Sequence, residues 1–238
     1  MIPIDDTPLC RDGKVLILAY DHGLEHGPVD FRDVSESADP ARTFEAATHP
    51  AVTSVAVQKG VAEAFYPSFE DDVDLLLKLN GTSNLWMGEP DSAVNCSVEY
   101  ADRLGAAAVG FTVYGGSNHE IEMVEEFRDA QEAARTHDLP VVMWSYPRGQ
   151  GLKNDTKPST ISYAARLALE LGADVAKVKH PGSRAAYAIV SGLVSFLTPW
   201  PRGYDHITTG RPCSRAASWT SRNSSNMRAS WFDPGYSV

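Results

Sequence analysis

The sequence predicts an α/β fold of the (β/α)8-barrel (TIM-barrel) class, here with only about six βα units. Up to about residue 182, short apolar segments alternate with amphipathic segments, which is the rhythm of parallel βα units. A Leu-Gly pair followed directly by an apolar segment occurs twice, at residues 104–111 and 171–178. Polar clusters follow several apolar segments, as expected at the strand ends that carry the chemistry of barrel enzymes. A dinucleotide-binding open sheet is the weaker alternative, because no GxGxxG motif follows the first apolar segment.

Six apolar segments are predicted to be strands. The first has the continuous sequence VLILAY, which is typical of a strand covered on both faces. A closed barrel of this class needs two strands more than these six. The predicted strands are residues 15–20, 53–57, 75–79, 106–113, 140–144 and 173–178.

Three amphipathic segments are predicted to be helices, at residues 91–104, 120–136 and 159–171. The first follows Pro90 and stops at Gly105, and the third follows Pro158 and stops at Gly172; these are common helix boundaries. The second helix is predicted to turn one apolar face to the core, with acidic residues opposite. That face would contain Ile121, Val124, Phe127 and Ala134.

The last 55 residues differ from the rest of the chain. They contain no lysine, many Ser, Arg, Pro and Trp residues, and no period of 2 or 3.6. We therefore divide the chain into an incomplete barrel over residues 1–183 and a non-matching tail over residues 184–238, which we expect to be irregular or disordered. Because six strands leave a barrel with two open edges, we expect the chain with this C-terminus to be inactive or poorly folded.

The composition limits the classes of partner. The formal net charge is −10, and such a surface repels nucleic acid and anionic membranes. A salt-rich cytoplasm and an ordinary acidic enzyme are both compatible with this charge. The three cysteines are far apart and suggest no disulfide framework. No signal peptide or apolar stretch of membrane-spanning length is evident, so we expect a cytoplasmic protein.

Lys177 is the most informative residue, because a charged lysine inside an apolar strand is costly to bury. Alternate residues of a barrel strand point inward, so Lys177 and Lys179 would share a face. Burial lowers the pKa of an amine, and a neutral amine can attack a ketone to form an iminium, which acts as an electron sink for C–C cleavage. The alternative is a lysine that reaches the barrel mouth or pairs with a carboxylate.

Other candidate residues follow the first and fifth predicted strands. Tyr146 could move a proton at the barrel mouth, and Arg148 has the fork that suits a phosphate. Asp21 could orient the lysine or substrate hydroxyls. For each there is a plainer alternative: Tyr146 as an aromatic plug, Arg148 in a surface ion pair, and Trp144 as a core residue.

A metal site is the weaker interpretation of His22, Glu25 and His26. Their segment lacks the helical HExxH spacing, and a third ligand is not obvious. We therefore predict no metal and no other cofactor.

Four motifs in order closely resemble the archaeal-type class I fructose-bisphosphate aldolases, a family of (β/α)8 barrels. The resemblance covers about residues 1–182, and the motifs are LILAYDHGLEHGP, GEPDSAVNCS, VVMWSYPRGQG and ADVAKVKHPG. The C-terminal part does not match, since nothing there resembles the glycine-rich turns with which the family grips a substrate phosphate.

The resemblance implies a reaction and a set of roles. The reaction is the reversible, metal-independent cleavage of fructose 1,6-bisphosphate into dihydroxyacetone phosphate and glyceraldehyde 3-phosphate. Lys177 would form the Schiff base, with Lys179 as its rival, and Tyr146 would be the acid/base. Asp21 completes the implied catalytic group, and the implied substrate-binding residues are Trp144, Arg148 and His26. Intact relatives are expected to form homo-oligomers.

Three other functions remain open at this point. One is the related synthase that makes 2-amino-3,7-dideoxy-D-threo-hept-6-ulosonate for aromatic biosynthesis with a similar lysine and tyrosine. Another is a non-catalytic remnant with exposed sheet edges. The third is a metal-dependent aldolase that uses the histidines.

Overall fold

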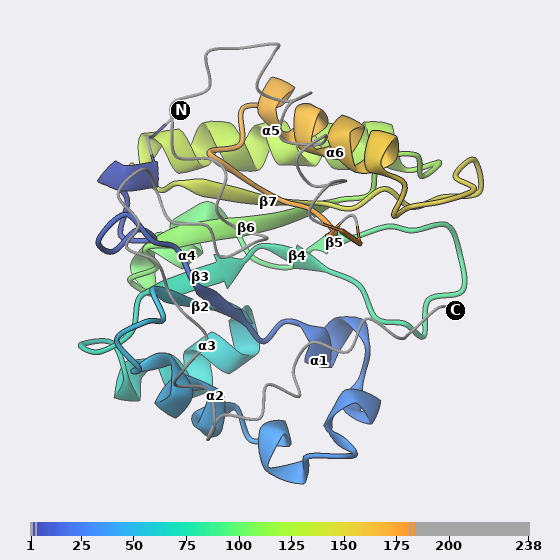
Figure 1. Cartoon of the computed structure of the whole chain (residues 1–238). Helices are drawn as coiled ribbons and strands as arrows, with labels where there is room; N and C mark the ends of the chain where they lie inside the picture. Colours follow the sequence, from blue (N-terminus) through green and yellow to red (C-terminus); the bar gives the residue numbers. More distant parts are fainter. Residues whose placement is uncertain (1, 3, 181, 184–238) are drawn as a thin grey trace.

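The centre of the structure is a curled parallel sheet with helices on its outer side (Figure 1). We analysed a computed structural model that describes residues 2, 4–180 and 182–183. The strand order is β1-β2-β3-β6-β7-β8, and every neighbouring pair is parallel. All six predicted strands are therefore confirmed, with ends that differ by a few residues. Their bounds are β1 Ile17–Ala19, β2 Ser54–Gln58, β3 Leu75–Lys78, β6 Ala108–Val113, β7 Val141–Ser145 and β8 Val175–Lys177.

The two faces of the sheet bury separate apolar clusters. Side chains on the outer face pack under the helices, as Phe111 does against Phe127 with ring centroids 5.7 Å apart. Side chains on the concave face form a smaller cluster that Ile4 and Leu9 from the N-terminal segment help to fill. The concave cluster also contains Ala56, Leu76, Ala108, Val142, Trp144 and Val175. This alternation is the pattern of a barrel wall, with inward and outward residues in turn along each strand.

Within the described residues, six α-helices and a short antiparallel strand pair lie between the strands of the sheet. The helices are α1 His22–Glu25, α2 Pro40–Ala47, α3 Lys59–Phe65, α4 Val98–Arg103, α5 Glu120–Thr136 and α6 Pro158–Glu170. Single 3-10 turns occur at Ile4–Asp6, Pro28–Phe31, Ser35–Ala38 and Tyr66–Ser68. The prediction of α5 is confirmed at both ends, and that of α6 to within one residue.

The predicted helix 91–104 is wrong in its first half. Only Val98–Arg103 is helical, and Ser97 is its N-cap, with a side chain that accepts a hydrogen bond from the Tyr100 amide. The preceding residues instead form β5, Ala93–Val94, which pairs antiparallel with β4, Asn80–Gly81. Pro90 is therefore not the start of a helix, because the segment after it is held in this hairpin.

The predicted apolar face of α5 is partly wrong. Phe127 and Ala134 are fully buried as expected, and Val124 packs against the core. Ile121, however, is 73% exposed, and Met123 is buried instead. Met123, Phe127 and Ala134 are spaced by four and seven residues, which defines a face rotated from the predicted one.

A buried carboxylate joins several segments at the N-terminal end of β8. Asp174 is fully buried and forms a bidentate ion pair with Arg135 of α5, with N–O distances of 2.8 and 2.9 Å. Its oxygens also accept hydrogen bonds from the amides of Val141 and Ile2, at 2.8 and 2.5 Å. The Asp174 carboxylate thus links the start of the chain, β7, β8 and α5, and both of its oxygens accept hydrogen bonds.

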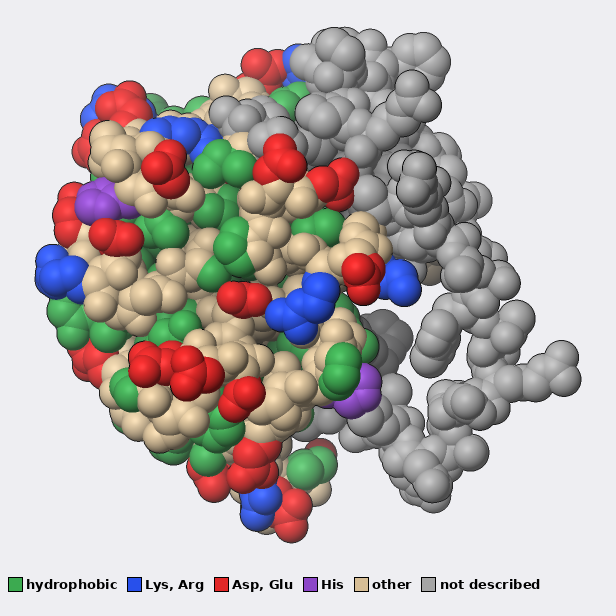
Figure 2. All heavy atoms as spheres, turned by 90° about the vertical axis from the view of Figure 1, so that its left-hand side faces the viewer, with side chains coloured by type: hydrophobic (Ala, Val, Ile, Leu, Met, Phe, Trp, Pro, Cys, Tyr) green, Lys and Arg blue, Asp and Glu red, His purple; other side chains and the backbone are tan. Residues whose placement is uncertain are grey.

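Acidic side chains are spread over the face in Figure 2, with fewer Lys and Arg side chains between them, in keeping with the net charge of −10. Cys96 is a buried free thiol, whereas Cys213 and the predicted tail 184–238 lie outside the described residues. None of the helices in the described ranges has the length and apolar character needed to cross a membrane.

Candidate active site

Lys177 occupies the last position of β8 on the concave face of the sheet. It pairs in register with Trp144 of β7, and its Nζ atom lies 4.6 Å from the centre of the Trp144 ring and 5.8 Å from that of Tyr146. Burial lowers the pKa of the Lys177 amine, against the opposing attraction of Asp21 and Glu25. These two carboxylates attract the amine without a hydrogen bond to it, and none is formed with the other described residues. The prediction that Lys177 faces inward as a readily deprotonated amine therefore fits its surroundings.

Tyr146 follows β7 and lies beside Lys177. The backbone amide of Tyr146 donates a hydrogen bond to Val113 at 3.1 Å, which extends the strand pairing past the end of β7. Burial, together with the carboxylates of Asp21 and Glu25, raises the pKa of the Tyr146 phenol. The phenol thus keeps its proton at neutral pH and can serve as a proton donor next to the amine.

Asp21 and Trp144 complete the group of predicted residues on this face. Asp21 directly follows the buried Tyr20 and is 6% exposed. Trp144 is 1% exposed, so it is a core residue, and its ring also lines the site beside Lys177. The Trp144 Nε1 and Asp21 Oδ2 atoms are buried and have no hydrogen-bond partner among the described residues. Such unsatisfied atoms are unusual in a core, and they leave one acceptor and one donor that can bind polar groups of a ligand.

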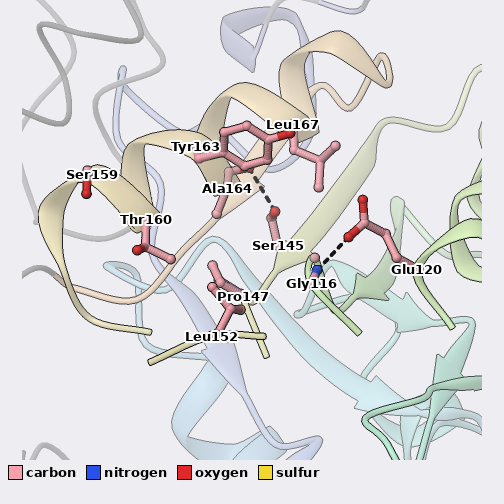
Figure 3. Close-up of a pocket in the computed structure, with 11 residues that line it drawn as sticks. Gly116, Glu120, Ser145, Pro147, Leu152, Ser159, Thr160, Tyr163, Ala164 and Leu167 are labelled. Atoms are coloured by element: carbon pink, nitrogen blue, oxygen red, sulfur yellow. Dashed lines mark hydrogen bonds between the residues drawn. The ribbon is translucent and has the colours of Figure 1, made fainter. Parts of the chain in front are cut away.

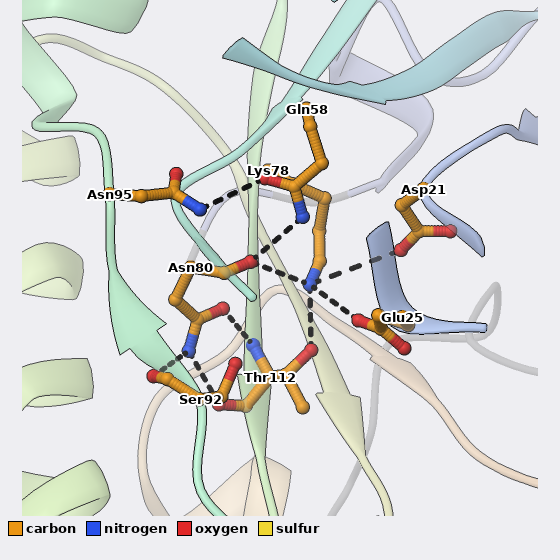
Figure 4. A network of polar contacts seen from close by, with 8 residues as sticks. All are labelled: Asp21, Glu25, Gln58, Lys78, Asn80, Ser92, Asn95 and Thr112. Carbon is orange, nitrogen blue, oxygen red and sulfur yellow. Dashed lines mark hydrogen bonds and ion pairs between the residues drawn. The ribbon is translucent and has the colours of Figure 1, made fainter. Parts of the chain in front are cut away.

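A second buried amine, Lys78 of β3, was not predicted. Its side chain is 0% exposed, and its Nζ donates to Thr112 Oγ1 at 2.7 Å and to the Asn80 carbonyl oxygen at 3.3 Å. Figure 4 shows the carboxylates of Asp21 and Glu25 turned toward the same nitrogen, at 3.9 and 3.7 Å. The signal for Lys78 was available in the sequence LLLKL, because it is the same as that for Lys177: a lysine inside an apolar strand.

The three residues considered for a metal site form no cluster of ligands among the described residues, although the His22 and His26 rings lie 6.3 Å apart. Glu25 points to Lys78, and burial raises its pKa. His22 packs against the Phe31 ring, with centroids 5.1 Å apart, while His26 is exposed and its Nδ1 lies 2.6 Å from Asp30 Oδ2. His26 therefore does not reach the group around Lys177 in this structure.

Arg148 and Lys179 lie in different settings around the site. The Arg148 guanidinium stacks near the Tyr114 and Tyr146 rings, 5.1 and 5.9 Å from their centres. Lys179 forms an ion pair with Asp155. Of the two lysines of the K-x-K motif, Lys177 is thus the one that faces Tyr146.

Glycines let the loop that carries Arg148 approach its neighbour. Gly149 has φ +142°, and a Cβ atom there would lie 2.0 Å from the Gly116 carbonyl oxygen. The Arg148 amide donates to the Gly115 carbonyl oxygen at 3.1 Å. The PRG and YGGS motifs are therefore packed together backbone to backbone.

A separate pocket of about 320 Å³ lies outside the sheet, between the end of β7 and α6 (Figure 3). Ser145 lines it and donates a hydrogen bond to the Ala164 carbonyl oxygen at 2.8 Å. Neither Lys177 nor Tyr146 lines this pocket. It is thus distinct from the group of residues on the concave face.

Comparisons with known proteins agree on one family. The model of the "DeoC/LacD family aldolase" matches residues 15–194. A "Fructose-bisphosphate aldolase class 1" of Halobacterium salinarum is 73% identical over 186 residues, which cover 78% of this chain and 71% of that protein. A 2-amino-3,7-dideoxy-D-threo-hept-6-ulosonate synthase of the same species is 30% identical over 179 residues, or 75% of this chain and 65% of that protein.

A solved structure gives the same result. It is described as an archaeal fructose-1,6-bisphosphate aldolase with its catalytic lysine covalently bound to the carbinolamine intermediate of the substrate. The TM-score is 0.74 at 47% sequence identity, and the match covers 77% of this chain and 72% of the other.

Proposed function

We propose that this chain, which belongs to the DeoC/LacD family of aldolases, is a Schiff-base fructose-bisphosphate aldolase. The reaction is the reversible cleavage of fructose 1,6-bisphosphate into dihydroxyacetone phosphate and glyceraldehyde 3-phosphate. The 73% identity to a class 1 fructose-bisphosphate aldolase supports this activity over that of the heptulosonate synthase, to which the identity is 30%.

Lys177 is the proposed nucleophile. Its neutral amine adds to the ketone carbon C2, and loss of water gives a protonated imine. When the C4 hydroxyl loses its proton, the C3–C4 bond breaks, its electron pair flows into the imine to give an enamine, and glyceraldehyde 3-phosphate leaves. Protonation of C3 followed by hydrolysis releases dihydroxyacetone phosphate and restores the amine.

The observation that carries this assignment is the setting of the Lys177 amine. It lies on the concave face between the rings of Trp144 and Tyr146, where burial favours the neutral form that the first step requires. Lys179, the rival, is held in an ion pair with Asp155, and a paired ammonium is a poor nucleophile.

Tyr146 is the proposed acid/base. Because its pKa is raised, the phenol is protonated at rest and can protonate the aldehyde oxygen when the C–C bond forms. By microscopic reversibility, cleavage starts from the phenolate, which forms when the phenol loses its proton to solvent, and this phenolate takes the proton of the C4 hydroxyl. Its ring lies 5.8 Å from the Lys177 nitrogen, so one substrate could contact both groups.

The remaining roles are proposed as follows. Asp21 offers a buried carboxylate oxygen that accepts no hydrogen bond from the described residues and is suited to a substrate hydroxyl, and Trp144 offers an indole N–H that donates none. Arg148 is proposed to bind a phosphate, since its fork matches that anion. His26 is proposed to contact the substrate, which would require it to leave Asp30.

The setting of the enzyme is part of the same proposal. We propose that it acts in the cytoplasm on free sugar phosphates of glycolysis and gluconeogenesis, without binding nucleic acid or membranes, and that it assembles as a homo-oligomer. We also propose that residues 1–183 form one structural unit distinct from residues 184–238. Sedimentation of the full chain, compared with that of an intact relative, tests the assembly.

The test of the activity is trapping of the imine. The full chain is incubated with dihydroxyacetone phosphate and cyanoborohydride, and the modified peptide is identified by mass spectrometry. The adduct is expected on Lys177, and Lys177→Met should abolish it while Lys179→Met should not. An adduct on Lys179 would overturn the residue assignment. Activity that a chelator removes would point to the metal-dependent reaction instead.

A further inference from the structure

We infer that Lys78 is a positioning residue of this site that carries the positive charge of the concave face, and thereby keeps the nearby Lys177 amine uncharged and reactive. The inference rests on the proposed role of Lys177. Lys78 would not itself form an imine; it would act on the reaction through Lys177 and through the two carboxylates that it holds.

The first support is the number of oxygen atoms around the Lys78 nitrogen. Thr112 Oγ1 and the Asn80 carbonyl oxygen accept hydrogen bonds from it, and Asp21 and Glu25 lie within 4.0 Å. Burial lowers the pKa of the Lys78 amine, as it does that of Lys177, and the carboxylates of Asp21 and Glu25 oppose this. An ammonium group has three N–H donors and no acceptor, so the oxygen atoms around Lys78 favour its charged form. The Lys177 amine is attracted by the same two carboxylates but forms no hydrogen bond with the described residues.

The second support is that these oxygen atoms are held in place by the backbone. The Thr112 amide donates to Asn80 Oδ1 at 2.7 Å, and Asn80 Nδ2 donates to the Thr112 carbonyl oxygen at 2.8 Å. Gln58 adds a hydrogen bond to the Asn80 carbonyl oxygen at 3.1 Å, and Asn95 supports Gln58 (Figure 4). Because other hydrogen bonds hold these acceptors in place, they favour the protonated Lys78 amine over the neutral one.

The third support is the indole ring that the two amines share. The Nζ atoms of Lys78 and Lys177 lie 4.9 and 4.6 Å from the centre of the Trp144 ring. Two ammonium groups at one buried ring would repel each other, and the like charge lowers the affinity of each for its proton. The geometry therefore accommodates one charge, and the oxygen atoms place it on Lys78.

Other groups also face the Lys177 amine and share its electrostatic environment. They come from the start of α1, from α1 itself, from β3 and from the segment after β7. The charge of each affects the pKa of the Lys177 amine. These groups are Asp21, His22, Glu25, Lys78 and Tyr146, and Arg148 lies near the Tyr146 ring.

The test compares the pH dependence of Lys177 in matched variants of the full chain. Removing the charge with Lys78→Met should raise the pH midpoint of imine trapping by about one unit, which is a roughly tenfold lower rate at pH 7. Lys78→Arg keeps a charge and should restore the midpoint toward that of the wild type. An unchanged midpoint in Lys78→Met would overturn the inference, as would an imine adduct on Lys78.

A milder pair of variants guards against a folding defect in Lys78→Met. Thr112→Val removes one acceptor from the Lys78 ammonium with little change of shape, while Thr112→Ser keeps the hydroxyl. Thr112→Val should shift the midpoint in the same direction by a smaller amount, and Thr112→Ser should not. Equal midpoints for the two variants would contradict the inference.

A second measurement separates this inference from the proposed function. Competitive acetylation of Lys177 as a function of pH reports the protonation of its amine without any substrate. If the wild-type chain traps no dihydroxyacetone phosphate, the proposed activity fails, yet a labelling midpoint that rises in Lys78→Met still supports the role of Lys78. A labelling midpoint that does not move would refute that role even in an active enzyme.

Discussion

Gly110 of β6 lies so close to Trp144 of β7 that a Cβ atom at Gly110 would come within 2.6 Å of the indole Cζ3. The same Cβ atom would lie 2.9 Å from the Lys78 side chain. The absence of a side chain at this one position therefore gives the indole and the buried amine their room on the concave face.

Gly110→Ala is expected to displace the indole ring and lower activity by at least about tenfold, with a stability loss of roughly 1–3 kcal/mol from overpacking. Steady-state cleavage and thermal denaturation measure the two effects. Gly60→Ala is the matched control, because a Cβ atom there meets nothing within 4 Å and a helical Ala is favoured over Gly. An active, fully stable Gly110→Ala chain would contradict the packing described for Trp144.

Arg135→Met should destabilise the fold by about 3–5 kcal/mol, because it leaves the fully buried Asp174 carboxylate without its charge partner. Chemical denaturation of both proteins measures the change. Arg128→Met removes an exposed pair with Asp129 and should change the stability by less than about 1 kcal/mol. Similar losses for the two variants would show that the Asp174 pair is no stronger than a surface pair.

Tyr146→Phe is expected to leave imine trapping at Lys177 largely intact and to lower the rate of C–C cleavage by about 10²- to 10⁴-fold. The phenol is proposed to move a proton only in the bond-breaking step. Since the pKa of Tyr146 is raised, its ionisation should not limit the rate of C–C bond formation between pH 7 and 9, whereas the rate of cleavage, which needs the phenolate, should rise with pH. Single-turnover measurements separate the two steps. Loss of both steps together would assign Tyr146 to binding instead.

The lowered pKa of Lys177 predicts a dependence of stability on pH. Between the folded pKa and the higher unfolded value, the unfolded chain binds more protons than the folded chain, so the free energy of unfolding rises with pH in that interval. Lys177→Met should remove this contribution and flatten the curve. Denaturation titrations from pH 6 to 10 measure it, and parallel curves for the two proteins would argue against a lowered pKa.

The excess of acidic residues predicts stabilisation by salt. The last 55 residues hold two of the 31 acidic and six of the 21 basic residues, which leaves 29 acids and 15 bases in the first 183. Raising the ionic strength from 0.1 to 1 M shortens the Debye length from about 10 to 3 Å and should raise the Tm by weakening this repulsion. A Tm that falls with added sodium chloride would contradict this.

Strands and long helices of this chain can be predicted from local sequence, because their signals lie within the segments themselves. The helix Glu120–Thr136 is long and amphipathic, and its predicted bounds are confirmed, although its buried face is rotated from the predicted one. The segment after Pro90 could not be assigned in this way. Its conformation is set by pairing with Asn80–Gly81, more than ten residues earlier in the chain. Local sequence does not indicate this pairing, which forms only in the tertiary structure.

The site shows the same division. Lys177 could be predicted because its charge stands out in an apolar strand, and Lys78 meets the same criterion within LLLKL. The part played by Glu25 could not be predicted, since the single helical turn His22–Glu25 is what brings its carboxylate to Lys78. His26, the next residue in the chain, lies against Asp30 instead.

The hydrogen bond from the Ile2 amide to Asp174 joins residues 172 positions apart. A contact of such separation closes a long loop, and it forms only after nearly every intervening segment has been ordered. During synthesis on the ribosome, the first residues must therefore wait for the strand Val175–Lys177 to emerge before they can dock. Amide exchange at Ile2 would accordingly report on the last step of assembly.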